Sequence, residues 1–237
     1  MKRMGSSSIW ECFIPELAEG QEYKYCFFTS NGNTLLKLDP YGVQTSAQPN
    51  NDSITCRLDS FSWTDAEWMR QRSLQSRHRP INIYQLHAGS WRRGEGNHFL
   101  RYEELAQQLP EYLRDMGYQY LELMPVMEYT FDGAWGYRTT GYFSPTFRYG
   151  TPQGLMQLID RCHSMGIGVI MDWNIAHFPK DSHGLIELDG DCCYEYSDPL
   201  KRCLLYTSWE MSAGFAPLHK SIRPAMLRPH QGIPGSW

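Results

Sequence analysis

Residues 151–173, TPQGLMQLIDRCHSMGIGVIMDW, decide the fold because they place a complete helix directly before a buried strand. Thr151 followed by Pro152 is a typical helix start, an N-cap with proline at the first helical position. The apolar side chains then recur at helical spacing, at Leu155, Leu158, Ile159, Cys162 and Met165. Gly166 fits the glycine that ends a helix, so IGVIMDW is predicted as the next strand.

The same alternation of elements precedes this stretch. INIYQLHAGSW, residues 81–91, predicts a strand, and YQYLELMPVM, residues 118–127, predicts another. Between them RYEELAQQLPEYLRDMGY, residues 101–118, predicts an amphipathic helix that Pro110 must kink or restart. Strand, helix, strand, helix, strand indicates βαβ units and a parallel sheet.

Residues 1–61 carry a different, all-β pattern. The segment 22–40, EYKYCFFTSNGNTLLKLDP, predicts a hairpin whose turn lies at residues 30–33. GSSSIWECFIP, residues 5–15, alternates with both faces partly apolar, as in a sandwich strand. Residues 62–80 are polar and basic, which predicts a linker with a short helix after Thr64 and a domain boundary near its end.

Composition narrows the function. The chain has 237 residues, 41% hydrophobic and 14% aromatic, with net charge −4, which suggests neither a nucleic-acid nor an anionic-membrane partner. No apolar stretch approaches the roughly 20 residues of a membrane span, and the first residues, MKRMGSSSIWECF, lack the apolar middle that a signal peptide has. The seven cysteines have no CxxC spacing, so we expect reduced thiols in the cytoplasm, without a disulfide framework or a metal site. No cofactor is implied.

Polar and aromatic residues gather after the predicted strands. Asp172 and His177 follow the third strand, as a sugar or phosphate site would require. A long loop predicted to be structureless, TFDGAWGYRTTGYFSPTFRYG at residues 130–150, follows the second strand and is expected to be functional. Taken singly, the aspartate can equally be a cap or turn former, and the histidine and the loop aromatics can be packing residues.

These segments together resemble the glycogen (1,4-α-glucan) branching enzymes of the α-amylase superfamily, glycoside hydrolase family 13. IYQLHAGSW is similar to their first barrel strand, ELMPVMEYTFDGAWGYRTTGYFSPTFRYGTPQGL to their second strand, its loop and helix, and VIMDWNIAHFPKDSHGL to their third strand. GSSSIWECFIP, EYKY and LLKLDPYG resemble the carbohydrate-binding β-sandwich that precedes the barrel.

The resemblance implies an α/β fold with an N-terminal all-β part. Residues 1–61 would be the C-terminal part of the carbohydrate-binding β-sandwich, residues 62–80 a linker, and residues 81–202 the first three βα units of a (β/α)8 barrel. Residues 203–237 stay unassigned; their start, CLLYTS, matches the translation of a sequencing-library transposase end, and we expect an artefact there.

The resemblance also implies a substrate site for α-1,4-glucans such as glycogen and amylose. Asp172 matches the aspartate of the superfamily's first signature region, which supports the sugar site. His177 matches the histidine that donates a hydrogen bond to a glucose hydroxyl, and Tyr137 the tyrosine that stacks on that sugar. Trp135 lies in the same loop, and His87, after the first strand, is a weaker candidate. Asn174 and Ile175 stand where the family more often has Val-Pro.

No catalytic residue is assigned, because the family takes its three carboxylates from barrel strands four, five and seven. Retention requires two carboxyl groups about 5 Å apart, and the later acidic residues lie in loop-like sequence: Glu187, Asp189, Asp191, Glu195, Asp198 and Glu210. A whole barrel needs about 250 residues. The sequence therefore predicts an inactive internal fragment of a branching enzyme.

Two other functions remain open. The chain can be a non-catalytic glucan-binding protein, or another superfamily member such as a trehalohydrolase or a debranching enzyme. If the chain is such a fragment, its sheet has an open edge. The buried face of that sheet would also have lost its packing partners; its residues include Leu121, Leu123, Ile170 and Met171. Because net stability is only about 5–15 kcal/mol, we expect the chain alone to be poorly soluble or molten.

Overall fold

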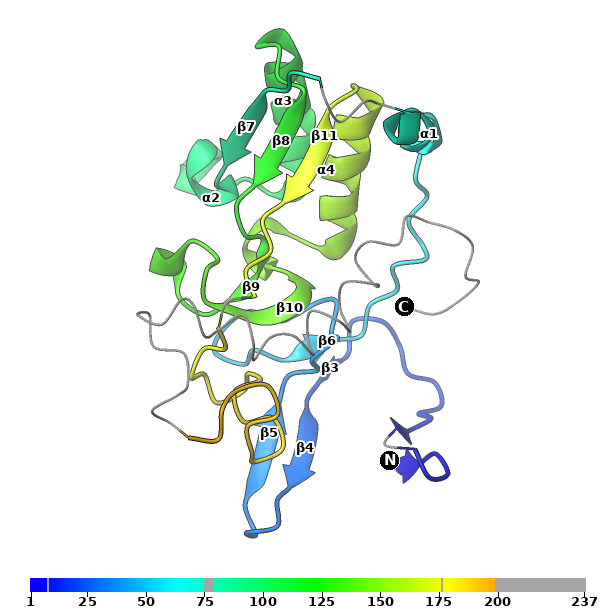
Figure 1. The fold of residues 1–237 in the computed structure, drawn as a ribbon, viewed down its shortest axis with the longest axis vertical. Coiled ribbons are helices and arrows are strands. Elements are labelled where there is room, and N and C mark those ends of the chain that lie inside the picture. Colours follow the sequence, from blue (N-terminus) through cyan, green and yellow to red (C-terminus); the bar gives the residue numbers. More distant parts are fainter. Residues whose placement is uncertain (8, 75–78, 176, 199–237) are drawn as a thin grey trace.

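The computed structural model describes residues 1–7, 9–74, 79–175 and 177–198 (Figure 1). The predicted tail, residues 203–237, lies outside the described residues, as does Glu210. Among the described residues, no helix has both the length and the apolar character needed to cross a membrane.

A three-stranded parallel sheet forms the centre of the larger part (Figure 1). Its strands in chain order are β7 (Ile83–Leu86), β8 (Tyr120–Leu123) and β11 (Gly168–Met171). Their spatial order is β11-β8-β7, and Leu123 is in register with both Leu86 and Met171. The three predicted strands and their parallel arrangement are therefore confirmed.

Two helices cover one face of this sheet (Figure 1). They are α3 (Tyr102–Asp115) and α4 (Pro152–Ser164). The core between helices and sheet is apolar, and its fully buried members include Leu105, Leu109, Leu113, Leu121, Leu123 and Leu158. Pro110 is buried inside α3. The helix runs on beyond it, so the predicted restart does not occur.

The ends of α4 agree with the prediction. The Thr151 hydroxyl accepts a hydrogen bond from the Gly154 backbone N–H at 3.2 Å, which satisfies one of the unpaired donors of the first turn. Gly166 has φ +78°, the left-handed conformation that favours glycine after a helix. Sequence-local rules are therefore sufficient to define this helix.

The other face of the sheet is not covered by these helices. Ile170, in register with Glu122 on this face, is 36% exposed, whereas Leu121 and Leu123 of the middle strand are buried under the helices. Met171, in register with Leu123 on the helix-covered face, is 39% exposed at the end of β11. The expected loss of partners therefore falls on the β11 residues and not on those of β8.

The segment after β8 is ordered, so the expectation of a structureless loop is wrong. β9 (Met127–Tyr129) pairs antiparallel with β10 (Thr139–Pro145). Short 3-10 helices, η2 (Asp132–Ala134) and η3 (Phe147–Tyr149), lie between and after these strands. The prediction failed because the hairpin is held by a buried ion pair, Glu128 with Arg148, that local sequence does not reveal.

The N-terminal part consists of short antiparallel pairs. Their strands are β1 (Lys2–Arg3), β2 (Trp10–Glu11), β3 (Glu22–Tyr23), β4 (Tyr25–Phe28), β5 (Thr34–Lys37) and β6 (Ser53–Ile54). The predicted hairpin is present as β4 and β5. Trp10 and Phe13, expected in a sandwich strand, lie exposed at the surface.

Three further elements complete the described fold. The predicted helix after Thr64 is present as α1 (Ala66–Leu74). Its approach is fixed by Asp65, whose carboxylate contacts His163 Nδ1 of α4 at 2.6 Å. The short helix α2 (Ala88–Trp91) follows β7, and η1 (Glu95–Asn97) precedes α3.

Candidate functional site

The candidate residues gather at one edge of the parallel sheet, where its carboxyl ends meet. His87 follows β7, the β9–β10 hairpin follows β8, and Asp172 follows β11. In barrels built from βα units this is the edge that carries active sites.

Tyr137 and Asp172 are in direct contact. The Tyr137 hydroxyl donates a hydrogen bond to Asp172 Oδ2 at 2.8 Å. The Asp172 backbone N–H donates to the Leu123 carbonyl at 2.9 Å, so the aspartate is fixed by an extension of the β8–β11 pairing. The Tyr137 carbonyl accepts from the Asn174 side-chain amide at 2.6 Å. Two of the predicted residues are thus joined by these contacts.

The environment keeps the Tyr137 phenol neutral. Burial, followed by the hydrogen bond to Asp172, raises the pKa of Tyr137 to about 12. The ring is still 37% exposed. The arrangement therefore holds a neutral aromatic ring at the surface by its hydroxyl, with the carboxylate as acceptor.

Trp135 is turned outward by an unusual backbone. It has φ +54° and ψ +30°, the left-handed region, which costs a non-glycine residue roughly 1–2 kcal/mol. Gly136 follows with φ +91°, and any side chain there would collide with the Pro125 carbonyl. The Trp135 side chain is 51% exposed and stacks on the His87 ring, with centroids 5.1 Å apart and an angle of 18°.

His87 belongs to the same edge. Its Nδ1 lies 3.0 Å from Ser90 Oγ, while its Nε2 is buried and has no hydrogen-bond partner among the described residues. Burial, with a smaller effect of Arg93, lowers the pKa of His87. The imidazole is therefore neutral near pH 7, and it lies against Trp135 at the sheet edge.

His177 is held by its backbone. Its carbonyl accepts a hydrogen bond from the buried Tyr142 hydroxyl at 2.8 Å. Burial, together with Arg138, lowers the pKa of His177. Within the part of the chain that the structure describes, no hydrogen bond joins the His177 ring to Tyr137 or Asp172. The structure thus places His177 in the same loop as Asp172, without linking its side chain to the pair.

Sequence reasoning missed two residues that support this edge. Tyr142 fixes the His177 carbonyl, and its own backbone carbonyl accepts from Trp173 Nε1 at 3.3 Å. No local signal marks Tyr142, because TTGYFSP of β10 has no regular alternation and most of its residues are buried. Asn174, noted only as a departure from the family, contacts the Tyr137 backbone.

Asp189, one of the later acidic residues, lies in a bend of the chain. Asp189 accepts from the Asp191 backbone N–H at 3.2 Å and from Cys193 Sγ at 3.3 Å, as expected for a turn former. No group of three or more His, Cys, Asp or Glu side chains placed to hold a metal occurs among the described residues.

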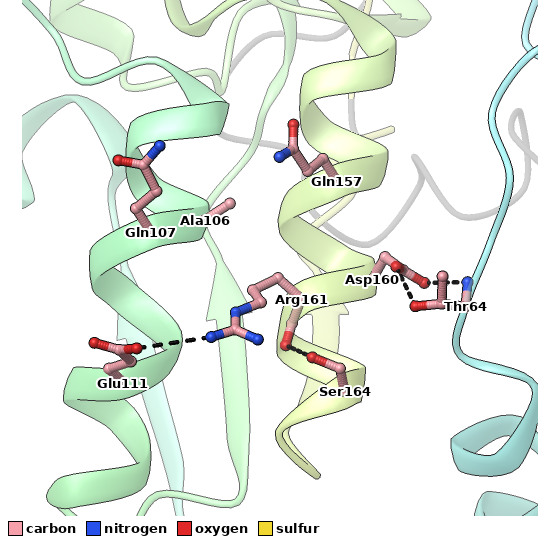
Figure 2. Close-up of a pocket in the computed structure, with 8 residues that line it drawn as sticks. All are labelled: Thr64, Ala106, Gln107, Glu111, Gln157, Asp160, Arg161 and Ser164. Atoms are coloured by element: carbon pink, nitrogen blue, oxygen red, sulfur yellow. Dashed lines mark hydrogen bonds and ion pairs between the residues drawn. The ribbon is translucent and has the colours of Figure 1, made fainter.

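A hollow of about 540 Å³ lies elsewhere, between the outer sides of α3 and α4 (Figure 2). Its charged side chains are already paired: Glu111 lies 3.6 Å from Arg161, and Asp160 accepts from the Thr64 hydroxyl at 2.7 Å. None of the described residues that line it has an aromatic ring, so these residues offer no flat apolar surface on which a sugar ring could stack. The sheet edge is therefore the better candidate.

Two family matches define the class of this chain. Residues 1–42 match carbohydrate-binding module 48 (isoamylase N-terminal domain), and residues 83–188 match the alpha amylase catalytic domain. The chain therefore carries a stretch of a carbohydrate-binding module followed by a stretch of an alpha-amylase catalytic barrel, and residues 83–188 belong to the alpha-amylase family.

Similar proteins point more narrowly to branching enzymes, which confirms the resemblance. A protein of Methylococcus capsulatus named 1,4-alpha-glucan branching enzyme is 47% identical over 201 residues, covering 84% of this chain and 27% of that protein. Its counterpart in Halothermothrix orenii is 48% identical, covering 85% of this chain and 32% of that protein. The chain thus spans about a third or less of the length of these relatives.

A solved structure supports the fold. The crystal structure of a putative alpha amylase from Salmonella typhimurium superposes with a TM-score of 0.60 at 26% sequence identity, covering 73% of this chain and 27% of that one.

Proposed function

We propose that this chain takes part in 1,4-α-glucan branching and that its sheet edge is the glucan-binding side of the site. The relatives named as branching enzymes support the activity. The observation that carries the proposal is the Tyr137–Asp172 hydrogen bond at the carboxyl edge of β8 and β11, because it fixes an exposed aromatic ring next to a carboxylate.

The reaction cuts an α-1,4 bond and transfers the freed chain to a 6-hydroxyl with retained configuration. Retention needs a nucleophilic carboxylate and a proton donor, and none of the described residues is assigned to either role. We infer that Tyr137 stacks on the glucose ring while Asp172 holds the tyrosine and accepts from sugar hydroxyls. His177, with its neutral imidazole, donates to a hydroxyl of the same glucose, and Trp135 extends the aromatic surface.

Glycogen or amylose is the proposed partner, and the cytoplasm the proposed compartment. The described cysteines are all free thiols, which agrees with a reducing environment.

Glucan binding by the 237-residue chain tests the site. We expect Tyr137→Ala to weaken maltoheptaose binding at least tenfold, equivalent to about 1.4 kcal/mol, because the stacking surface is lost. Phe28→Ala is the matched control, since Phe28 is an exposed ring of the β4–β5 hairpin. Isothermal titration gives both affinities. Loss of binding in the control alone would favour the alternative, a glucan-binding protein that uses its β module.

Transplantation tests the activity. Residues 83–188 replace the matched segment of the Methylococcus capsulatus relative, and new α-1,6 linkages in amylose are counted by proton NMR. We expect branching in this chimera, a strong loss in its Asp172→Ala variant, and none from the 237-residue chain alone. A chimera that removes α-1,6 linkages from amylopectin would instead favour a debranching enzyme, and one that releases trehalose from a trehalose-terminated maltooligosaccharide would favour a trehalohydrolase.

A further inference from the structure

Lys37, at the end of β5, is a buried lysine that reaches out of its own module. It is 3% exposed. Its ammonium donates hydrogen bonds to the Ser182 carbonyl at 2.7 Å and to the Gly184 carbonyl at 3.3 Å. The neighbouring Leu38 backbone N–H donates to the His183 carbonyl at 2.9 Å. One end of the β4–β5 hairpin thus binds three successive carbonyls of the loop that follows β11.

Burial of this ammonium requires compensation. A buried charge without partners is strongly unfavourable, and burial lowers the pKa of Lys37 while Glu187 opposes the shift. The two loop carbonyls accept hydrogen bonds from the ammonium, and Glu187 supplies an opposite charge. Such a buried group is sensitive to change, because removing one partner leaves the others desolvated and unpaired. The contact therefore ties the loop to the module with a definite geometry.

The loop that runs from His177 to Gly184, which Lys37 contacts at its far end, is held by further contacts along its length. The Gly184 N–H donates to the Asp181 carbonyl at 2.9 Å. The Asp181 carboxylate lies 3.6 Å from the guanidinium of Arg138, the residue directly before β10. Phe178 is buried against the Tyr142 ring, with centroids 5.5 Å apart. Tyr142 in turn holds the His177 carbonyl.

Side-chain packing also joins the module to β10 and to the segment around Gly190. Tyr41 of the module stacks on Phe143 of β10 at 5.4 Å, and the space at Gly190 is bounded by Thr29 and Leu35 of the β4–β5 hairpin. Figure 1 shows the yellow-to-orange segment that follows β11 lying beside β5. The module therefore packs around the loop, and Lys37 adds charged hydrogen bonds to the loop itself.

We propose that Lys37 is a positioning residue for glucan binding: it anchors the 177–184 loop from the carbohydrate-binding module so that His177 is presented to the sugar. The proposal rests on the proposed function and adds that the module acts on the site through the loop. The module then supports the barrel loop, whether or not it also binds glucan through its own surface.

Hydrogen–deuterium exchange and titration on the 237-residue chain test this. Lys37→Met keeps a long apolar stem but leaves the Ser182 and Gly184 carbonyls unpaired. We expect amides of residues 178–188 to lose at least tenfold in protection and maltoheptaose to bind about tenfold more weakly. Lys37→Arg keeps the charge and is expected to restore part of both. Lys180→Met is the matched control, an exposed lysine of the same loop, and should change neither.

Each outcome decides. Unchanged exchange in Lys37→Met, or no protection of residues 178–188 in the unmodified chain, overturns the anchor. Lost protection with unchanged affinity, measured well below the melting temperature, leaves Lys37 purely structural and overturns the positioning role. If the unmodified chain binds no maltoheptaose, the proposed function fails, and with it the positioning role; the exchange data still decide whether Lys37 holds the loop.

Discussion

The hydroxyl of Tyr137 is a probe of its own site. Asp172→Asn removes the carboxylate that accepts from it, so we expect the pKa of Tyr137 to fall from about 12 towards the ordinary value of about 10. Titration of ¹³Cζ-labelled tyrosines by NMR measures this. Asp115→Asn, in an exposed pair with Arg114, is the control. A value that stays near 12 in Asp172→Asn would mean that burial alone sets the shift.

Tyr137 should also make the folding stability of the chain depend on pH. Its pKa is raised in the folded state, so the folded chain binds its proton more tightly than the unfolded chain does. The contribution is complete below about pH 10 and declines as the pH rises towards about 12. Denaturant midpoints over this range should fall more steeply in the unmodified chain than in Tyr137→Phe. Parallel profiles would contradict the linkage.

Residues of this site differ in how far sequence alone could place them. Asp172 follows a clear strand pattern, and the resemblance singles out Tyr137 and His177 as well. The Trp135–His87 stack depends on a left-handed residue, a conformation that tryptophan rarely adopts and that no local rule assigns to it. Tyr142 acts on a backbone carbonyl 35 positions away, and such a contact has no sequence signature.

The β9–β10 hairpin depends on one buried ion pair. Arg148 Nη1 contacts Glu128 Oε1 at 2.9 Å, with both side chains almost fully buried. The Tyr129 and Phe147 backbone N–H groups also donate to this carboxylate at 3.0 Å. Burial raises the pKa of Glu128, and Arg148 opposes that shift. The hairpin that carries Trp135 and Tyr137 therefore depends on the Glu128 carboxylate, which would be buried and unpaired if Arg148 were removed.

Arg148→Met should accordingly destabilise the chain by about 3–5 kcal/mol, since the Glu128 charge would remain buried and unpaired. Adding Glu128→Gln should recover part of this loss. Urea unfolding measures both variants. Arg114→Met, which breaks an exposed pair, should cost no more than about 1 kcal/mol. A loss in Arg148→Met as small as in this control would rule out the ion pair as the support of the hairpin.

Elements were predictable where their signals are local. The helix α4 has its N-cap, its proline, its apolar spacing and its terminal glycine within one segment. The β9–β10 hairpin has no such local signals. Glycine and polar residues interrupt its alternation, and its key ion pair, Arg148 with Glu128, joins positions 20 apart. Pro110 is expected to kink or restart the helix. It is buried within α3, which continues beyond it, so the restart is wrong, because tertiary packing outweighs helix propensity here.

At the scale of the whole molecule, local pattern cannot show how the two parts meet. Lys37 and Gly184 are 147 positions apart, and a lysine at the end of a short strand is predicted to be solvated. The resemblance supplied the order of the two modules but not their contact. The contact that the Lys37 ammonium makes between the two parts could therefore be found only in the three-dimensional structure.

The parallel sheet sets the behaviour of the whole chain. Among the described strands, β7 and β11 each pair with β8 alone, and Ile83 and Ile170, in the register of the uncovered face, are 40% and 36% exposed. Unpaired edges and exposed apolar side chains favour association. We therefore expect the 237-residue chain to associate as its concentration rises and to melt broadly.

Two variants on adjacent positions of β11 separate the faces of this sheet. Ile170→Thr, in the register of the uncovered face, should improve solubility with little loss of structure. Val169→Thr, on the residue that packs against the helix-covered core, should lower the melting midpoint, because it buries a hydroxyl. Calorimetry and analytical ultracentrifugation measure both. A sharp, cooperative melt of a monodisperse monomer in the unmodified chain would show instead that three strands and two helices suffice as a folding unit.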